Sequence, residues 1–152
     1  MYYFAYGSNM DLGQMSKRLG RKIAPSEVKK ASVREWKLVF NKKADANPEK
    51  QGYANIVEDA NEIVEGVLYE ISEEDIEELD KYEGCPEHYK KMEIEVALDT
   101  GEKVVAITYI AQENKIGTGL LPTREYLNKL LNAKPFLTPE YYERLKAQPT
   151  LD

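Results

Sequence analysis

The chain opens with the stretch Met1-Tyr-Tyr-Phe-Ala-Tyr-Gly-Ser-Asn-Met10, which combines an aromatic run with a turn of small residues. The run Tyr2–Tyr6 predicts a short strand that ends at Gly7-Ser8-Asn9. Asp11 is a suitable N-cap, so we expect a short helix over 12–19. A strand–turn–helix corner of this kind leaves backbone N–H groups without partners, and such groups can hold a carboxylate or an oxyanion.

The remaining pattern predicts an α+β fold. The segment 31–41 alternates, with Trp36, Leu38 and Phe40 on one face, whereas 42–51 has loop composition. Further strands are expected over 52–57, 63–71, 91–98 and 103–111, and further helices over 72–82, 123–132 and 138–147. The strand over 103–111 is apolar on both faces, which favours an inner position. The length and the lack of a convincing domain boundary predict a single domain over 1–152, and the few crossover helices between the strands favour the α+β class. Its architecture would be a small mixed, largely antiparallel, barrel-like sheet with flanking helices.

The composition limits the classes of partner. In 152 residues the net charge is −6, which disfavours nucleic acid on electrostatic grounds. Any anionic substrate must therefore be held by backbone N–H groups or by a few well-placed cations. One cysteine and one histidine exclude a disulfide framework and leave too few ligands for a zinc site. We expect no metal, no cofactor, no membrane segment and a cytoplasmic location.

One carboxylate lies on the apolar side of an acidic helix. In the helix over 72–82, Ile76 and Leu79 define the buried stripe, and Tyr82 and Glu83 are the next positions in register. Burial and the negative end of the helix dipole would both raise the pKa of Glu83, as a general acid/base at neutral pH requires. The alternative is that the helix frays before Glu83 and its side chain turns into water. The spacing leaves both readings open.

Several motifs together resemble the gamma-glutamylcyclotransferase family, and the likeness runs nearly from end to end. They are Tyr6-Gly-Ser-Asn9, Gly52-Tyr-Ala-Asn-Ile56, Val64-Glu-Gly-Val-Leu-Tyr69, Leu79-Asp-Lys-Tyr-Glu-Gly84, Pro122-Thr-Arg-Glu-Tyr126 and the final stretch Leu137–Leu145. The resemblance implies that the chain converts a γ-glutamyl amino acid or amine into 5-oxoproline and a free amine, without a cofactor. The branch that acts on γ-glutamyl amino acids is the most similar, and γ-glutamyl-lysine and glutathione are alternative substrates.

The resemblance also implies roles for individual residues. Glu83 would be the general acid/base. The residues expected to line the substrate cavity are Tyr6, Gly7, Ser8, Asn9, Tyr89 and Tyr126. The amides of the Gly7-Ser8-Asn9 turn would bind either the α-carboxylate or the developing oxyanion. Thr123 stands where the family often has serine and keeps the hydroxyl. We expect the leaving-group pocket around 41–51 and 113–121.

The residues also allow other interpretations. Cys85 and His88 are the only cysteine and histidine and could form a thiolate–imidazole pair. The pair Lys42-Lys43 could meet a carboxylate on the leaving amino acid, although a solvated surface pair is the simpler interpretation. A non-catalytic binding protein for a γ-glutamyl-like metabolite is a second class. A third is an interaction module, in which the Tyr141-Tyr142 pair and the loop over 42–51 form a homodimer contact.

Overall fold

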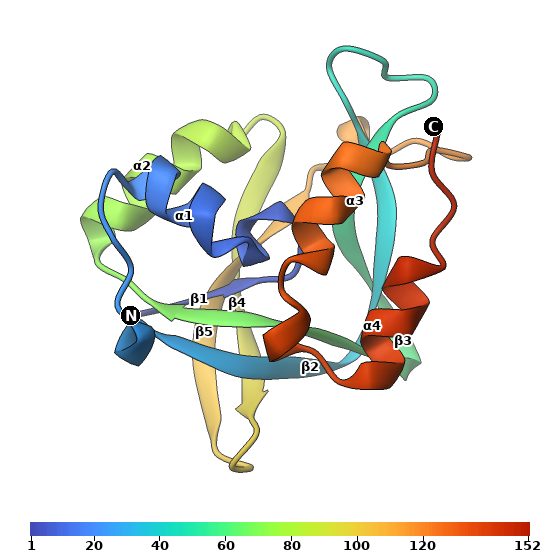
Figure 1. Cartoon of the computed structure of the whole chain (residues 1–152). Helices are drawn as coiled ribbons and strands as arrows, with labels where there is room; N and C mark the ends of the chain where they lie inside the picture. The colour runs from blue at the N-terminus through green and yellow to red at the C-terminus, as the bar shows by residue number, and fades with distance from the viewer.

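The computed structural model describes all 152 residues, and its strands close into a barrel in the order β1-β3-β2-β4-β5 (Figure 1). The strands are β1 (Tyr2–Ala5), β2 (Val28–Lys43), β3 (Gly52–Glu70), β4 (Tyr89–Leu98) and β5 (Lys103–Ala111). β1 pairs in parallel with β5, and the other pairs are antiparallel. The expected α+β fold with a largely antiparallel, barrel-like mixed sheet is confirmed.

Four α-helices flank the barrel: α1 (Leu12–Leu19), α2 (Glu73–Glu83), α3 (Arg124–Leu131) and α4 (Pro139–Lys146). α1 packs on α2, and α3 packs on both α4 and the 3-10 turn η1 (Ser8–Met10) (Figure 1). Three further 3-10 turns are η2 (Pro25–Glu27), η3 (Glu113–Lys115) and η4 (Lys134–Phe136). The N-cap predicted at Asp11 is confirmed, because its side chain accepts hydrogen bonds from first-turn N–H groups. The side chains of Ser72, Thr123 and Thr138 cap the other three helices in the same way.

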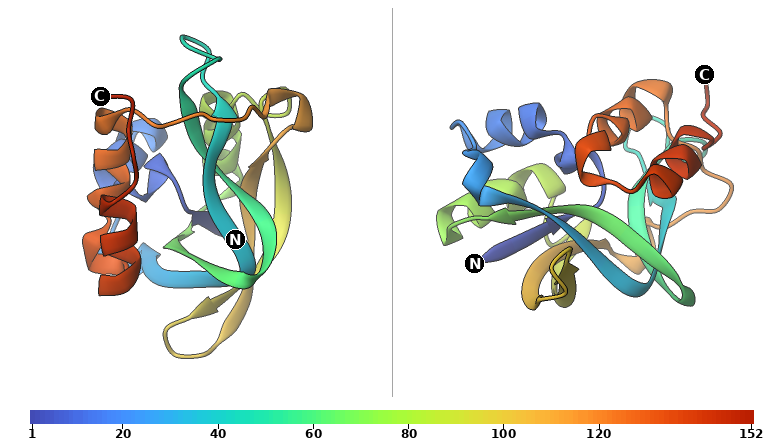
Figure 2. Two further views of the ribbon diagram at one scale, coloured as in Figure 1. Left: turned by 90° about the vertical axis from the view of Figure 1, so that its right-hand side faces the viewer. Right: turned by 60° about the horizontal axis from the view of Figure 1, so that its bottom comes forward.

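The predicted break between two strands at 58–62 is wrong. β3 runs through this segment and is paired with β2 on either side of it, with Trp36 opposite Glu58 and Arg34 opposite Ile63, whereas residues 59–62 have no partner in β2. A register shift between those pairs absorbs the extra residues, and Glu35 has φ 68° there. The polar residues therefore bend a continuous hairpin instead of ending it. Figure 2 shows the resulting long, curved ribbon of β2 and β3.

The core is one cluster of 31 buried residues, drawn from the barrel interior and the inner faces of the helices. Ile76 and Leu79 of α2 belong to it, as the helical spacing predicts. Tyr82 does not: it is 54% exposed, because it lies at the rim, under the guanidinium of Arg18 at 4.9 Å. β5 does have neighbours on both sides, but Val105 is 59% exposed, so its outer face is not buried.

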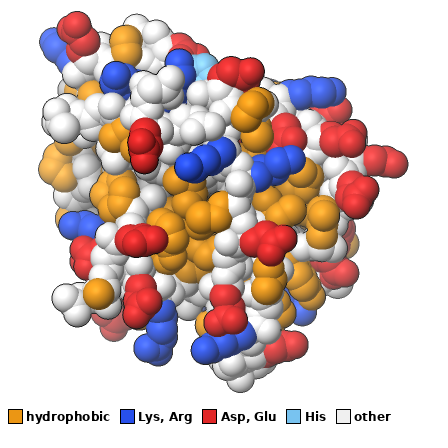
Figure 3. All heavy atoms as spheres, turned by 180° about the vertical axis from the view of Figure 1, so that it is seen from behind, with side chains coloured by type: hydrophobic (Ala, Val, Ile, Leu, Met, Phe, Trp, Pro, Cys, Tyr) orange, Lys and Arg blue, Asp and Glu red, His pale blue; other side chains and the backbone are white.

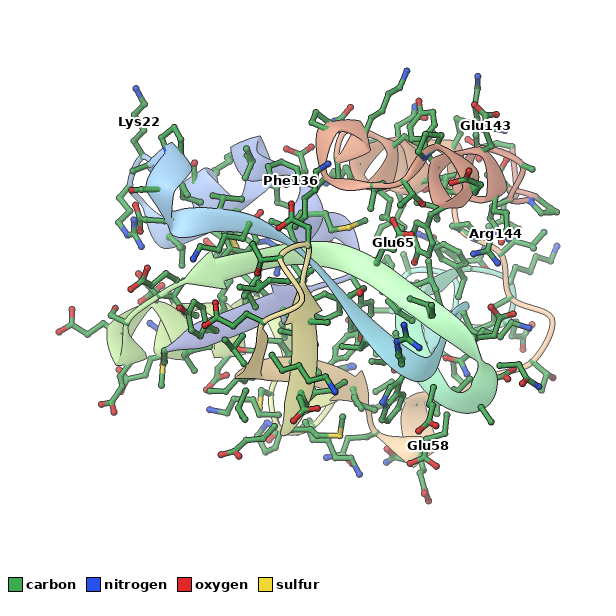
Figure 4. All side chains as sticks on the ribbon, turned by 90° about the horizontal axis from the view of Figure 1, so that it is seen from below. Lys22, Glu58, Glu65, Phe136, Glu143 and Arg144 are labelled. Atoms are coloured by element: carbon green, nitrogen blue, oxygen red, sulfur yellow. The ribbon has the colours of Figure 1, made fainter.

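The outer surface has two further features. On the side opposite the view of Figure 1, hydrophobic side chains gather near the centre among charged ones (Figure 3). At the C-terminal side, the carboxylate of Glu65 accepts hydrogen bonds from the N–H and the hydroxyl of Thr138, each at 2.7 Å, which fixes the start of α4 on β3 (Figure 4).

No helix has both the length and the apolar character needed to cross a bilayer.

The structure corrects the proposed Tyr141-Tyr142 surface pair. Tyr141 is only 5% exposed and belongs to the core, because it lies on the face of α4 that packs against the barrel. Tyr142 is half-buried, with the ammonium of Lys134 5.0 Å from its ring centre. The two tyrosines therefore do not form a common surface for a second copy.

Candidate active site

The strand–turn–helix corner forms as the sequence predicts. After β1 the chain makes the turn η1, in which the N–H groups of Met10 and Asp11 donate to the carbonyls of Gly7 and Ser8. The amides of Gly7, Ser8 and Asn9 therefore have no partner inside the turn.

Gly7 is required by a close approach rather than by its backbone angles. A Cβ atom at this position would lie 3.0 Å from the Cβ atom of Ala54 and 3.3 Å from the hydroxyl of Tyr126. The turn therefore sits directly against β3 and α3.

Glu83 is the last residue of α2, so the helix does not fray before it. Gly84 ends the helix in the left-handed conformation, with φ 61°. The Glu83 side chain is 17% exposed and points to the corner, where the side-chain amide of Asn9 donates to its Oε1 at 3.1 Å. The guanidinium of Arg18, one helix away, lies 3.9 Å from the same oxygen.

Burial raises the pKa of Glu83 from 4.5 to about 7, because the apolar surroundings disfavour the charged form. The cations of Arg18 and Lys42 act in the opposite direction and lower it. The result is a carboxyl group that both accepts and releases a proton near neutral pH. This is the property expected from the position of Glu83 on the apolar stripe.

Asn9 makes several hydrogen bonds and positions Glu83 through one of them. Its side-chain amide also donates to the Tyr3 hydroxyl at 3.0 Å, and its Oδ1 accepts from Arg18 at 3.0 Å and Gln14 at 3.1 Å. Its main-chain carbonyl accepts from a further tyrosine hydroxyl. The side chain was expected to line the substrate cavity. The structure shows that its amide nitrogen and oxygen are both already hydrogen-bonded within the protein, and that one of these bonds holds the carboxylate.

Buried tyrosines surround the corner and fix one another through the backbone. Ala54 in β3 accepts from the hydroxyl of Tyr89 at 2.9 Å and donates its N–H to the hydroxyl of Tyr126 at 3.0 Å. The hydroxyl of Tyr6 donates to the carbonyl of Tyr109. Burial raises the pKa of Tyr6, Tyr89 and Tyr126, so these phenols stay neutral hydrogen-bonding groups at physiological pH.

The structure brings all the predicted site residues together. They line an inner cavity of about 40 Å³: Tyr6, Gly7, Ser8, Asn9, Glu83, Tyr89 and Tyr126, with Tyr3, Ala54 and Tyr109 completing the wall. A larger outer cavity of about 600 Å³ opens beside it. Four residues border both cavities, namely Ser8, Glu83, Tyr89 and Tyr126. Glu83 therefore lies at the junction between a narrow polar cavity and a wide one.

The outer cavity differs in part from the expected leaving-group pocket. The segment 41–51 contributes Lys42, Asp45 and Gln51, as expected, but 113–121 contributes nothing. The helices α1 and α3 form that wall instead, with Gln14, Arg18, Glu125 and Lys129. Their polar faces converge only because both helices pack around η1, which the sequence does not reveal.

The interpretation of Lys42 as a solvated surface residue is wrong, because its side chain is buried and the residue is only 3% exposed. It continues the buried face of Phe40 in β2, two residues further along the strand. Extending the alternation of Leu38 and Phe40 by one step would have found it. The loop composition of the segment obscured that signal.

The proposed thiolate–imidazole pair gains no support from the geometry. Burial and the nearby carboxylate of Asp80 raise the pKa of the Cys85 thiol, whereas a thiolate nucleophile needs a lowered one. His88 faces Asp45 instead, with its Nδ1 4.0 Å from the carboxylate.

Proteins of known family and known structure are similar to this chain in sequence and in fold. The model of the family described as gamma-glutamyl cyclotransferase, AIG2-like, matches residues 3–128. None of the curated proteins matches the chain significantly. A solved structure described as gamma-glutamyl cyclotransferase is 25% identical with a TM-score of 0.83, and the match covers 100% of this chain and 89% of that one. An uncharacterised human protein, LOC79017, is 25% identical with a TM-score of 0.80, covering 99% and 89%. YkqA from Bacillus subtilis is 24% identical with a TM-score of 0.81, covering 99% and 55%.

Proposed function

The chain belongs to the gamma-glutamyl cyclotransferase, AIG2-like family, and on that premise we propose that it releases 5-oxoproline from a γ-glutamyl amino acid. Family and fold support a gamma-glutamyl cyclotransferase-like activity. The observation that carries the finer proposal is Glu83. Its carboxyl group is buried at the junction of two cavities, with a pKa of about 7 and a fixed orientation.

The reaction is an intramolecular aminolysis. The α-amine of the glutamyl group attacks its own γ-carbonyl carbon, a five-membered ring closes through the new C–N bond, and the original amide C–N bond breaks. Nucleophile and electrophile belong to one molecule, so holding the chain in a folded conformation supplies much of the rate. The tyrosine-lined inner cavity is suited to that task because its walls are fixed by hydrogen bonds to Ala54 and Tyr109.

Proton transfer is the part that needs a catalytic group. The α-amine is an ammonium ion near neutral pH and must lose a proton before it can attack. Ionised Glu83 accepts this proton and delivers it to the departing nitrogen as the amide C–N bond breaks. The ring nitrogen, which carries two hydrogens after the attack, then loses its second proton through Glu83 to the released amine. The products are 5-oxoproline and an ammonium ion, and the carboxylate is regenerated at the end of the cycle. A pKa of about 7 suits both steps, because neither protonation state is strongly favoured. Asn9 and Arg18 keep the carboxylate oriented between the two steps.

The turn supplies the groups that bind negative charge. The amides of Gly7, Ser8 and Asn9 have no partner inside the turn, and they border the inner cavity next to Glu83. They are suited to bind the α-carboxylate of the glutamyl group or the oxyanion that develops on the γ-carbonyl. Backbone amides bind an anion without an additional cationic side chain, which suits a chain with a net charge of −6.

The test is release of 5-oxoproline from γ-glutamyl-α-amino acids, γ-glutamyl-ε-lysine and glutathione, with Glu83→Gln measured in parallel. The proposal expects turnover by the wild-type protein and loss of at least about 100-fold in the variant, the scale of general acid–base catalysis. Full activity in a folded variant would assign the proton transfer to another group. Ligand binding by calorimetry without any turnover would favour the binding-protein interpretation.

A further inference from the structure

Lys42 is a buried cation that lines the outer cavity and has no anionic partner. It is 3% exposed, and its ammonium group donates one hydrogen bond, to the carbonyl of Lys43 at 2.8 Å. The rings of Tyr89 and Tyr53 lie 5.6 and 5.8 Å from the ammonium nitrogen. Two carboxylates act on this ammonium group electrostatically without forming an ion pair with it: Asp45, whose side chain is 85% exposed, and Glu83. An ammonium group with three donors is thus buried while using only one of them.

The other cations around this cavity already have partners. Arg18 donates to Asn9 and faces Glu83, Lys81 pairs with Glu78 at 2.9 Å, and Lys129 donates to Gln14 at 2.8 Å. Lys42 differs from all three because it is buried. Like Lys129, it has only a neutral hydrogen-bond partner, the carbonyl of Lys43. A buried charge is unfavourable unless an opposite charge compensates it. An anion that enters the outer cavity would supply that compensation.

The position of Glu83 determines which part of a substrate would bring the anion. This step rests on the proposed function. The reacting amide must lie at Glu83, where the two cavities meet, with the glutamyl group toward the Gly7–Asn9 turn. The leaving amine then extends into the outer cavity. Lys42 lines this outer cavity but does not line the inner one. Tyr89 borders both cavities and lies beside the ammonium group, so Lys42 is next to the junction.

We infer that Lys42 is the specificity-determining residue for the leaving group, and that it binds a carboxylate placed close to the departing nitrogen. The preferred substrates are therefore γ-glutamyl-α-amino acids, in which that carboxylate is attached to the carbon bearing the amine. Uncharged γ-glutamyl amines lack the anion. In γ-glutamyl-ε-lysine the carboxylate lies five carbons from the scissile nitrogen, beyond the site of Lys42.

The experiment compares two substrates that differ only by the carboxylate, γ-glutamyl-alanine and γ-glutamyl-ethylamide. The variants are Lys42→Met, which keeps the length of the side chain without its charge, and Lys42→Arg, which keeps the charge. Lys43→Met is the matched control, because it removes the neighbouring lysine outside the cavity lining. Turnover of the ethylamide and the thermal midpoint report whether each variant is folded.

We expect the wild-type protein to favour γ-glutamyl-alanine over the ethylamide by roughly 10- to 100-fold in kcat/KM, the range of a hydrogen bond to a charged group. Lys42→Met should remove this preference by raising KM for γ-glutamyl-alanine alone. Lys42→Arg should restore part of it, and Lys43→Met should retain it.

Three results would overturn the inference. Turnover of both substrates without a preference would show that the leaving carboxylate is not recognised. An equal loss on both substrates in Lys42→Met would instead assign the lysine to the glutamyl carboxylate, which they share. Absence of turnover with either substrate in the folded wild-type protein would overturn the proposed function, and this inference with it.

Discussion

Replacing Glu83 with glutamine should abolish activity and, at the same time, make the protein more stable at alkaline pH. The carboxyl group is buried, and its pKa is raised from 4.5 to about 7. Below pH 4.5 the group is neutral in both the folded and the unfolded chain, so it resembles glutamine. Between these values the unfolded chain loses the proton while the folded chain keeps it, so the stability of the wild-type protein falls as pH rises.

The size of the effect follows from the shift. Each unit of pKa difference corresponds to about 1.4 kcal/mol, so the ionised group destabilises the folded state by about 3 kcal/mol above pH 7. Most of this difference develops between pH 5 and pH 8, over which it changes by about 2.5 kcal/mol. The carboxylate is still 17% exposed, so water weakens the penalty and the figure is an upper value.

The assay is urea unfolding of the wild-type and Glu83→Gln proteins at pH 5 and pH 8. The variant should gain about 2 kcal/mol relative to the wild type between these two pH values. Any loss of the contact with Asn9 shifts both values alike and cancels in the comparison. Glu77→Gln is the control, since it makes the same substitution at an exposed position of α2. A stability difference that does not change with pH would refute the burial argument, whatever the activity.

The remaining predictions concern the rate. In pH profiles, kcat/KM should increase as pH rises through about 7, because Glu83 must be ionised to accept a proton; an increase at about pH 4 to 5 would contradict the raised pKa. Gly7→Ala should lower kcat/KM by roughly 10-fold or more, since its Cβ would press on Ala54 at 3.0 Å and on the Tyr126 hydroxyl at 3.3 Å. The thermal midpoint shows whether that variant is folded, and an unchanged rate would mean that the turn does not need its close approach. Cys85→Ala should leave turnover nearly unchanged, and its collapse in a folded variant would revive the thiol mechanism.

Local signals account for what the sequence predicted well. The helix caps at Asp11 and Thr123 depend on a side chain and the N–H groups of the next turn, so short stretches are sufficient to recognise them. The position of Glu83 follows from the spacing of Ile76 and Leu79 along one helix. Where tertiary pairing overrides composition, the predictions were wrong: the segment 58–62 stays in β3 because β2 pairs with Glu58 before the register shift and with Ile63 after it.

The residues around Glu83 were also predicted only in part from the sequence. The sequence identified the turn and the acid. Arg18 was missed, and Lys42 was interpreted as a solvated surface residue, because both side chains reach the site from separate elements. Arg18 arrives because α1 packs on α2, and Lys42 is buried because β2 extends past the predicted loop boundary.

The sequence by itself determined the caps, the turn, most of the strands and the residues expected around the glutamyl group. Only the tertiary structure decided the pKa of Glu83, the engagement of Asn9 and the burial of Lys42. The physical reason is that burial and charge depend on which segments lie next to each other in space. Such contacts join residues that are 74 positions apart, as between Asn9 and Glu83, and no local pattern along the chain specifies them.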